Sequence, residues 1–391
     1  MQTRLHSRVG GLRRLRDDER GMSLVFVGLG LVSFMAATTL AIDVGMFMTA
    51  RNQAQNSADA GALAGAVALV RNGYEDRTPT GPIVQSAIET AQNNLTAGKT
   101  VSVEAGDVTF PLGPTGLNNR VQVQVYRTVG RGNPIDTLVG GFFGVDTVNI
   151  TATAVAEASS ANAMTCVKPF MIPDKWIEKQ TAPWDVTDEY DKWASKGVLL
   201  ANPDVFIKDG PEYTGYSYKN DTGKTLVLRA GKGGNIVPSF YYSWKMPGDT
   251  GGDFYRENIE NCNQAVIVRG TTIIQEPGAM EGPTIKGIEA LIAKDPDARW
   301  DEGCSCVKGS KYTKQSPRLF PIPLYDPEFT ADNKDHGRAA EYRISNFLGF
   351  FADSVRGSEI YGRITTVSGL VAPTAPGAPD TSLATAIRLV Q

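Results

Sequence analysis

The chain has 391 residues, of which 41% are hydrophobic and 21% are charged, and its formal net charge is −3. This is the composition of a globular protein rather than a disordered one, and the length allows two domains with a real hydrophobic core. Because Lys and Arg are not clustered beyond the N-terminal tail, the charge gives no reason to expect a nucleic-acid partner.

An uncharged stretch runs from Met22 to Ile42. As an α-helix it would be about 31 Å long, close to the thickness of a bilayer's hydrocarbon core, and it is therefore a candidate transmembrane helix. Arginines are frequent in residues 1–20, and the orientation rule counts Lys and Arg, so this basic tail is expected in the cytoplasm. The alternative is a cleaved secretory signal, but its apolar region would be shorter, and the helical pattern continues past Asp43 without a break.

The helix is expected to continue outside the membrane, so that residues 21–71 form one helix whose first part is transmembrane. Beyond the span, small residues recur every four positions and give one edge of the helix almost no side-chain bulk: Ala50, Ala54, Ala58, Ala62 and Ala66, with Gly61 and Gly65 beside them. Such an edge lets another backbone approach closely. The sequence leaves open whether it packs on the chain's own next domain or on another subunit.

Two acidic residues on this helix, Asp43 and Asp59, bear on assembly. Asp43 falls where the span should meet the outer interface of the bilayer. It is interpreted either as a hydrated boundary residue or as half of a buried ion pair with a neighbouring subunit. The residues assigned to helix packing and assembly are Asp43, Ala54, Ala58, Asp59, Ala62 and Gly65.

Residues 72–160 are predicted to form a small α+β domain. The strand within it is the clearest signal, because the sequence RVQVQVYR alternates strictly between apolar and polar residues. In chain order the pattern predicts a helix at 83–97, an extended segment at 101–110, this strand at 120–127, a short apolar helix at 135–143 and a second strand at 146–156.

Residues 161–391 are predicted to form a β-rich extracytoplasmic domain, because short apolar runs alternate with crowded turn signals. The segments expected in it are strands at 224–230, 265–268 and 322–324, a helix at 282–294, and an extended or loosely held end after Ala372. The predicted fold class is therefore α+β, with a long N-terminal helix, a small α+β unit and a β-rich second domain.

All four cysteines lie on the side of the span predicted to be outside the cytoplasm, where disulfides persist: Cys166, Cys262, Cys304 and Cys306. A bond between Cys304 and Cys306 is the least expected pairing, because a single intervening residue makes a strained ring. We therefore expect Cys166 and Cys262 each to bond one of the other two. A zinc site is the alternative, but Cys-x-Cys without a nearby histidine lacks the usual spacing.

Catalytic patterns are scarce in this sequence. Outside the tail its one histidine, His336, stands in a polar run expected to be an exposed loop, and no phosphate-binding G-x-x-x-x-G-K-[ST] loop occurs. No catalytic, cofactor-binding or metal-binding residue is therefore assigned, and no cofactor is expected.

Two acidic runs are candidates for calcium binding through oxygen ligands, and the alternative is that both are solvated loops. Their acidic residues are Asp185, Asp188, Glu189 and Asp191 in the first run and Asp326, Glu328, Asp332 and Asp335 in the second. Aromatic residues around the first run indicate either a carbohydrate- or surface-binding patch or core packing beneath a loop: Trp176, Trp184, Tyr190 and Trp193.

Three short motifs mark the segment from Glu19 to Leu69. They are an Arg-Gly pair before the span, an Ala-x-Asp-x-Gly sequence at its end and an Ala-Asp-Ala core beyond it, at Arg20-Gly21, Ala41 to Gly45 and Asn56 to Ala64. In these motifs the chain resembles the TadE/TadG-like family of Flp/Tad pilus-assembly proteins. The segments 276–300 and 317–327 also look like extracytoplasmic segments of longer members of this family.

The resemblance implies a minor pilin-like structural or assembly component of a bacterial Flp/Tad-type (type IVc) pilus, not an enzyme. Such a protein is anchored once in the inner membrane, with its C-terminal domain in the periplasm or outside the cell, and it enters the pilus if it is processed. Gly21 is the candidate processing position, although Phe26 stands where type IV prepilins usually carry a glutamate.

The partners that the resemblance implies are the membrane and other pilin or Tad subunits. A surface or a carbohydrate is a further candidate partner, and no nucleic acid is expected. The alternative function is that of a membrane-anchored cell-envelope enzyme such as a hydrolase, which the scarcity of histidine and the missing catalytic motifs disfavour.

Overall fold

The computed structural model describes residues 19–71, 76–113, 116–312, 315–333 and 340–390. Within them a long, apolar N-terminal helix is followed by mixed helices and strands, which confirms the predicted α+β class. By their contacts the residues fall into two compact units whose segments alternate along the chain. The first unit takes the residues up to Gly61 with Ala87–Val108 and Val123–Ala154, and the second takes Ala62–Ser86, Thr109–Gln122 and Val155–Gln391.

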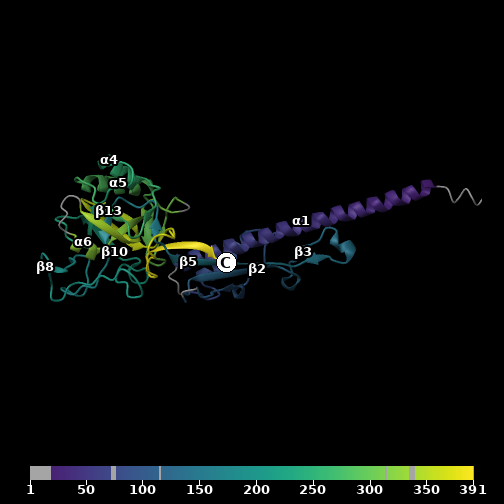
Figure 1. The fold of residues 1–391 in the computed structure, drawn as a ribbon, viewed down its shortest axis with the longest axis horizontal. Coiled ribbons are helices and arrows are strands. Elements are labelled where there is room, and N and C mark those ends of the chain that lie inside the picture. The colour runs from purple at the N-terminus through teal and green to yellow at the C-terminus, as the bar shows by residue number, and fades with distance from the viewer. Residues whose placement is uncertain (1–18, 72–75, 114–115, 313–314, 334–339, 391) are drawn as a thin grey trace, which may run out of the picture. The chain divides into compact units, whose positions relative to one another are not determined.

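The first helix, α1 (Glu19–Arg71), continues without interruption through the predicted span and beyond it (Figure 1). In the described part of the chain it is the helix that is long and apolar enough to cross a membrane. Its apolar side chains in the span are bare: Leu24 is 77% and Phe34 71% exposed. A helix is stable in apolar surroundings, because its backbone N–H and C=O groups form hydrogen bonds with one another inside the helix.

Beyond the span, α1 is buried along its alanine edge. Ala54, Ala58 and Ala62 are at most 1% exposed. A second backbone approaches closely at Gly61, where an added Cβ would lie 2.9 Å from the carbonyl oxygen of Ala87 in α2 (Pro82–Asn93). Of the two uses of this edge that the sequence left open, the structure therefore shows the intramolecular one.

Short elements follow along the chain, and β2 (Arg120–Arg127) is the most regular of them. Its apolar residues Val121, Val123 and Val125 are fully buried, as the alternation predicted. The other elements up to residue 160 are η1 (Ala105–Asp107), β1 (Val108–Thr109), η2 (Val129–Arg131), β3 (Ile135–Asp136), η3 (Gly140–Phe143), β4 (Thr147–Val148) and β5 (Ile150–Ser160).

The apolar helix predicted at 135–143 was wrong. Residues 135–136 form β3, which pairs antiparallel with β4 so that Ile135 faces Val148. Only the short 3-10 helix η3 forms in the rest of the segment. The neighbouring glycines Gly140 and Gly141 explain the difference, because glycine loses more conformational freedom in a helix than any other residue.

The last strand, β20 (Ala384–Val390), pairs antiparallel with β5, from Thr385 opposite Ser160 to Val390 opposite Val155. It belongs to a five-stranded sheet of order β1-β2-β5-β20-β19, in which β19 is Val367–Ser368. Of the residues expected as an extended or loosely held end, Ala384–Val390 are thus extended and paired in a sheet.

Glu157 on β5 joins this sheet across three strands. Its carboxylate lies 2.6 Å from the guanidinium of Arg120 on β2 and 3.1 Å from that of Arg388 on β20. The side chain of Glu157 is buried, so the two arginines neutralise a charge that has little contact with water.

The second unit contains a seven-stranded sheet of order β13-β17-β16-β7-β11-β10-β18. β17 also pairs with β18, so the strands from β17 through β16, β7, β11 and β10 to β18 close into a ring, as in a β-barrel. The strands of this sheet are β7 (Phe170–Pro173), β10 (Thr225–Ala230), β11 (Phe240–Ser243), β13 (Thr272–Ile274), β16 (Leu319–Tyr325), β17 (Glu341–Arg356) and β18 (Glu359–Thr365).

The remaining elements of this unit surround the seven-stranded sheet, with α4 and α5 side by side on it (Figure 1). They are β6 (Ala163–Met164), β8 (Trp193–Ser195), β9 (Val198–Leu199), α3 (Tyr218–Asp221), α4 (Gly252–Glu260), β12 (Ile267–Val268), α5 (Glu281–Lys294), β14 (Arg299–Asp301), β15 (Cys306–Lys308) and α6 (Pro327–Asp332). The predicted strands at 224–230 and 322–324 and the predicted helix at 282–294 correspond to β10, β16 and α5.

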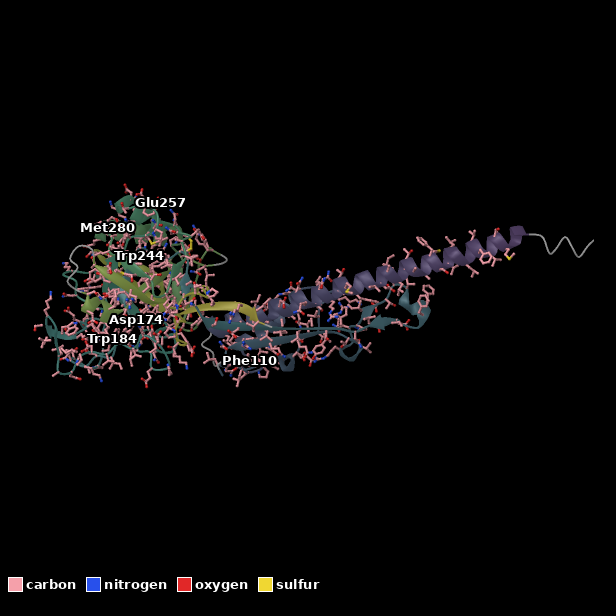
Figure 2. All side chains as sticks on the ribbon, viewed as in Figure 1. Phe110, Asp174, Trp184, Trp244, Glu257 and Met280 are labelled. Atoms are coloured by element: carbon pink, nitrogen blue, oxygen red, sulfur yellow. A yellow bond between two sulfur atoms is a disulfide. The ribbon has the colours of Figure 1, made fainter. Side chains whose placement is uncertain are left out.

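Asp174, directly after β7, is fully buried in this unit (Figure 2). Its carboxylate accepts hydrogen bonds from the hydroxyls of Tyr213 at 2.8 Å and Ser345 at 2.9 Å. The backbone N–H groups of Lys175 and Tyr216 donate to its other oxygen at 2.9 and 3.0 Å. Asp174 therefore joins three segments of the chain, at 174–175, 213–216 and 345, through one side chain.

The disulfides join Cys166 to Cys262 and Cys304 to Cys306, so the predicted cross-pairing was wrong. Ser305 has a φ of 47° and turns the chain sharply between β14 and β15. This turn leaves the Cα atoms of Cys304 and Cys306 5.2 Å apart, within the ordinary range for a disulfide. Spacing along the chain alone did not reveal this turn.

Candidate functional site

The carboxylate of Asp43 on α1 is buried, with the residue 2% exposed, and it accepts three backbone hydrogen bonds. The donors are the N–H groups of Leu138 at 2.9 Å, Val139 at 3.0 Å and Gly140 at 2.8 Å. Successive N–H groups that point into one concavity form an anion-binding nest. Asp43 thereby fastens the turn at 138–140 to α1.

This turn belongs to the hairpin of β3 and β4, and we call residues 137–145 the hairpin tip. Thr137 closes its base, since its N–H donates to the carbonyl of Asp146 at 3.0 Å and its hydroxyl to the carbonyl of Val145 at 2.7 Å. Gly140 has no room for a side chain, because an added Cβ would lie 2.6 Å from the carbonyl oxygen of Val145. The tip is therefore held by its own backbone as well as by α1.

The hairpin tip is apolar and exposed. It reads TLVGGFFGV and contains no charged residue. Phe142 and Phe143 are 87% and 67% exposed, and Leu138 is 66% exposed. Neighbouring large apolar side chains left bare in this way mark an interaction surface.

An apolar crevice of about 360 Å³ lies between the hairpin tip and α1. Its lining residues are Ala36, Ala37, Leu40, Asp43 and Phe47 from α1 and Thr137, Gly140, Phe143 and Val145 from the tip. Three of them, Ala36, Ala37 and Leu40, belong to the uncharged span. The crevice is thus next to the end of the span that Asp43 marks.

The structure corrects the interpretation of Asp43 as a hydrated boundary residue, because the hairpin tip withdraws its carboxylate from water. Sequence reasoning missed this partner, which lies 95 positions away at Leu138. The glycines at 140, 141 and 144 are the one signal that could have indicated a tight turn there.

The other residues assigned to helix packing lie beyond the span. Gly65 is buried together with the alanines of the edge. Asp59 is half-buried, and its carboxylate accepts a hydrogen bond from Nε2 of Gln55 at 2.8 Å. Gly21 lies inside α1, which begins at Glu19.

The acidic runs do not gather a group of metal-ligating side chains within the described residues. Lys192 instead lies between Glu328 and Asp332, with N–O distances of 2.9 and 2.8 Å. Asp335 and His336 fall outside the described residues.

The aromatic residues around the first acidic run pack in a hydrophobic core rather than on an open face. Trp176 and Tyr190 are 2% and 5% exposed, and their ring centroids lie 5.4 Å apart in an edge-to-face arrangement. Trp184 contacts Trp176 in the same way at 6.2 Å. Trp193 is partly exposed and donates its indole N–H to Asp332 at 3.2 Å. Core packing, the second interpretation, therefore describes Trp176, Trp184 and Tyr190.

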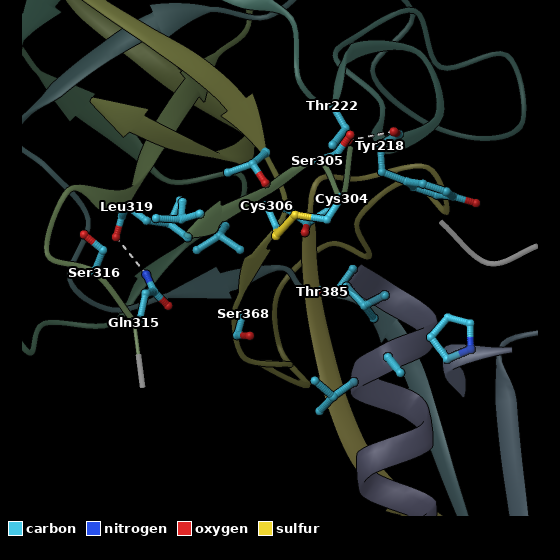
Figure 3. A pocket seen from close by; sticks show the side chains of 18 of the residues that line it. Tyr218, Thr222, Cys304, Ser305, Cys306, Gln315, Ser316, Leu319, Ser368 and Thr385 are labelled. Carbon is cyan, nitrogen blue, oxygen red and sulfur yellow. Dashed lines mark hydrogen bonds between the residues drawn. A yellow bond between two sulfur atoms is a disulfide. The ribbon is translucent and has the colours of Figure 1, made fainter. Parts of the chain in front are cut away.

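A wider cavity of about 1270 Å³ lies within the second unit (Figure 3). Figure 3 shows the Cys304–Cys306 bridge and Thr385 among the groups that line it. Of its described lining residues only Asp76 and Lys219 are charged. The described lining residues include no histidine and a single carboxylate.

Comparison with known families finds matches in the N-terminal part of the chain. Residues 21–68 match the family described as putative Flp pilus-assembly TadE/G-like, and residues 48–156 match the family described as putative Tad-like Flp pilus-assembly. The resemblance found in the sequence motifs is thereby confirmed over residues 21–156, which contain α1 beyond its first residues and the whole hairpin tip. No curated protein and no solved structure matches the chain.

Proposed function

From the two Flp pilus-assembly families that residues 21–156 match, we propose that this protein is a minor pilin-like structural or assembly component of a Tad-type (type IVc) pilus. In this role α1 is a single-pass anchor in the inner membrane. Residues 1–20 stay in the cytoplasm, and the rest of the chain beyond the span lies outside it. The role is structural, without a reaction of its own.

One observation carries the proposal. The matched residues comprise α1, whose first half is apolar and bare, and the small elements against which its second half is packed. A bare apolar helix needs lipid or the helices of other subunits around it. A pilus subunit meets lipid before assembly and neighbouring helices after it.

We place the contact with other subunits on the face of α1 that the chain itself leaves free. Val44 and Met48 are 47% and 63% exposed on this face, and Asn52 and Asn56 are exposed one and two turns beyond Met48. Asp59, bonded to Gln55, is half-buried at the border of this face. The alanine edge serves the fold of each subunit, and this exposed face serves the contact between subunits.

The test of this placement is Met48→Glu, which puts a charge on the free face without touching the packed edge. We expect the full-length variant to accumulate in membranes at the wild-type level while surface pili are lost, because a buried unpaired charge opposes subunit packing. The matched control is Val198→Glu, which places the same charge on β9, where Val198 is 55% exposed. The control strain should remain piliated.

Intact mass and N-terminal sequencing then distinguish a filament subunit from an anchored assembly factor. A chain that begins at Met22 in sheared pili has been cut after Gly21 and incorporated. A full-length chain confined to membranes is an assembly or envelope-bridging factor. Normal piliation in a strain that lacks the protein would overturn the proposed function as a whole.

A further inference from the structure

We propose that the hairpin tip, residues 137–145, is inserted into the non-cytoplasmic leaflet of the membrane beside α1, and that lipid acyl chains fill the crevice between the two. This rests on the membrane anchor of the proposed function. It adds a second point of membrane contact, made by a segment far from the span in sequence.

The attachment to α1 fixes the depth of the hairpin tip. Asp43, which holds the N–H groups of the turn, is the first charged residue after the start of the span at Met22. The crevice shared by the tip and α1 reaches back to Ala36. At 1.5 Å per residue, Ala36 lies about 10 Å from Asp43 toward the membrane. With α1 across the bilayer, the tip shares the depth of the last two turns of the span.

The side chains of the hairpin tip suit lipid. No charge occurs within it, whereas Asp136 at the end of β3 and Asp146 just before β4 flank it. Phe142 and Phe143 are among the most exposed large apolar side chains of the described residues. Removing apolar surface from water is favourable, and the boundary of the hydrocarbon core accepts aromatic side chains well.

A non-helical segment in a membrane needs partners for its backbone polar groups, and most N–H groups of the hairpin tip have one. Asp43 accepts from three N–H groups at the start of the tip. Carbonyls within the tip accept from Phe142 at 3.0 Å, Gly144 at 3.2 Å and Val145 at 3.0 Å. An acidic residue at this depth is costly unless it is paired, and here the nest of N–H groups supplies the pairing.

Lipid is the occupant that the crevice fits. Its α1 wall includes Ala37 and Leu40, which lie within the span itself. Lipid acyl chains surround this part of α1 as soon as it is inserted, before any other subunit arrives. The crevice is thus continuous with the surface that the anchor already presents to lipid.

Site-directed spin labelling of the full-length chain tests the proposal. All four cysteines of the sequence are in disulfides, so one added cysteine can carry a nitroxide. The chain is reconstituted in vesicles of phosphatidylethanolamine and phosphatidylglycerol. The test position is Phe142→Cys. The lipid reference is Phe34→Cys on the bare part of α1, and the water reference is Val129→Cys on η2, where Val129 is 60% exposed.

The measured quantity is the ratio of nitroxide relaxation by oxygen to relaxation by a water-soluble nickel chelate. We expect this ratio at position 142 to match that at position 34 and to exceed that at position 129 by about tenfold, because polar solutes partition poorly into hydrocarbon. A ratio at 142 equal to that at 129, with 34 in lipid, would overturn the inserted tip. A label at 142 shielded from both reagents would also overturn it, in favour of a protein partner.

Two further results separate this proposal from the anchor. A label at position 34 that meets the nickel chelate freely would refute the membrane anchor and with it the inserted tip. Asp43→Asn, added to the Phe142→Cys chain, should lower the ratio at 142 toward the water value, because it removes the charge that holds the turn. Asp59→Asn is the matched control and should leave the ratio unchanged. An unchanged ratio in Asp43→Asn would show that Asp43 does not seat the tip.

Discussion

Replacing Asp174 by asparagine is expected to remove part of the pH dependence of stability. Burial raises the pKa of Asp174 to about 6 from its ordinary value of 3.8, although hydrogen bonds from Tyr213, Tyr216, Ser345 and Lys175 oppose the rise. The unfolded chain therefore releases this proton at a lower pH than the folded chain. The free energy of unfolding then falls as the pH rises from about 4 to about 6, and it changes little through this group above that interval.

The rise in pKa sets the size of the effect. Each pKa unit corresponds to about 1.4 kcal/mol, so the rise from 3.8 to about 6 predicts that the wild-type chain loses about 3 kcal/mol of stability through Asp174 across this interval. Asp174→Asn keeps an oxygen for the N–H groups of Lys175 and Tyr216 but cannot ionise. Its stability should therefore fall less with pH, by about 3 kcal/mol.

The assay is urea unfolding of the detergent-solubilised full-length chain, followed by tryptophan fluorescence, at pH values from about 4 to about 7. The test compares how steeply the free energy of unfolding falls with pH in the two chains. The absolute free energy of unfolding is not compared, because the new amide offers Tyr213 and Ser345 a donor in place of an acceptor. Asp249→Asn, at an exposed position, is the matched control and should keep the wild-type slope. Equal slopes in wild type and Asp174→Asn would refute the reasoning.

Three more substitutions test the packing. Gly61→Ala should destabilise the chain by about 1–3 kcal/mol in the same urea assay, because its Cβ would overlap α2, whereas Gly45→Ala meets nothing within 4 Å and should be neutral or slightly stabilising. Lys168→Met should lower the stability by about 1.5–3 kcal/mol, because the buried ammonium donates hydrogen bonds to carbonyls at the end of α4. Hydrogen exchange of the α4 amides measures this loss, and unchanged protection of these amides would contradict the prediction. Burial raises the pKa of Glu157, but its hydrogen bonds and charge interactions with Arg120 and Arg388 lower it further, and the pKa lies below its usual value. The contribution of Glu157 to the free energy of unfolding is therefore lost as the pH falls. Glu157→Gln should cost about 1–2 kcal/mol and make β20 more accessible to protease, and equal cleavage in both chains would contradict this.

The elements with a regular period could be predicted from the sequence. The uncharged span and the helical spacing after it predicted α1, and the alternation of Val121, Val123 and Val125 predicted both β2 and its buried face. Such patterns are local, because a helix or strand repeats its buried positions every few residues. The family motifs between Glu19 and Leu69 likewise lie within one helix.

The features that depend on contacts between distant segments could not be predicted in this way. Asp43 and its partner Leu138 are far apart in sequence, and no period links them. The pairing of Cys304 with Cys306 depends on the positive φ of Ser305, and a serine at this position does not predict a positive φ. The helix expected at 135–143 was favoured by apolar composition alone, and strand pairing with β4 prevailed over it.

The position of β20 in the sheet has a consequence for folding during synthesis. Arg388 on β20 and its partner Glu157 on β5 are 231 positions apart. Until the ribosome has made β20, the edge of β5 that β20 will cover has unpaired N–H and C=O groups. An unpaired edge is a template for pairing with another chain, and long-range strand pairing is slow. A chaperone that shields β5 during this delay would therefore protect the nascent chain from aggregation.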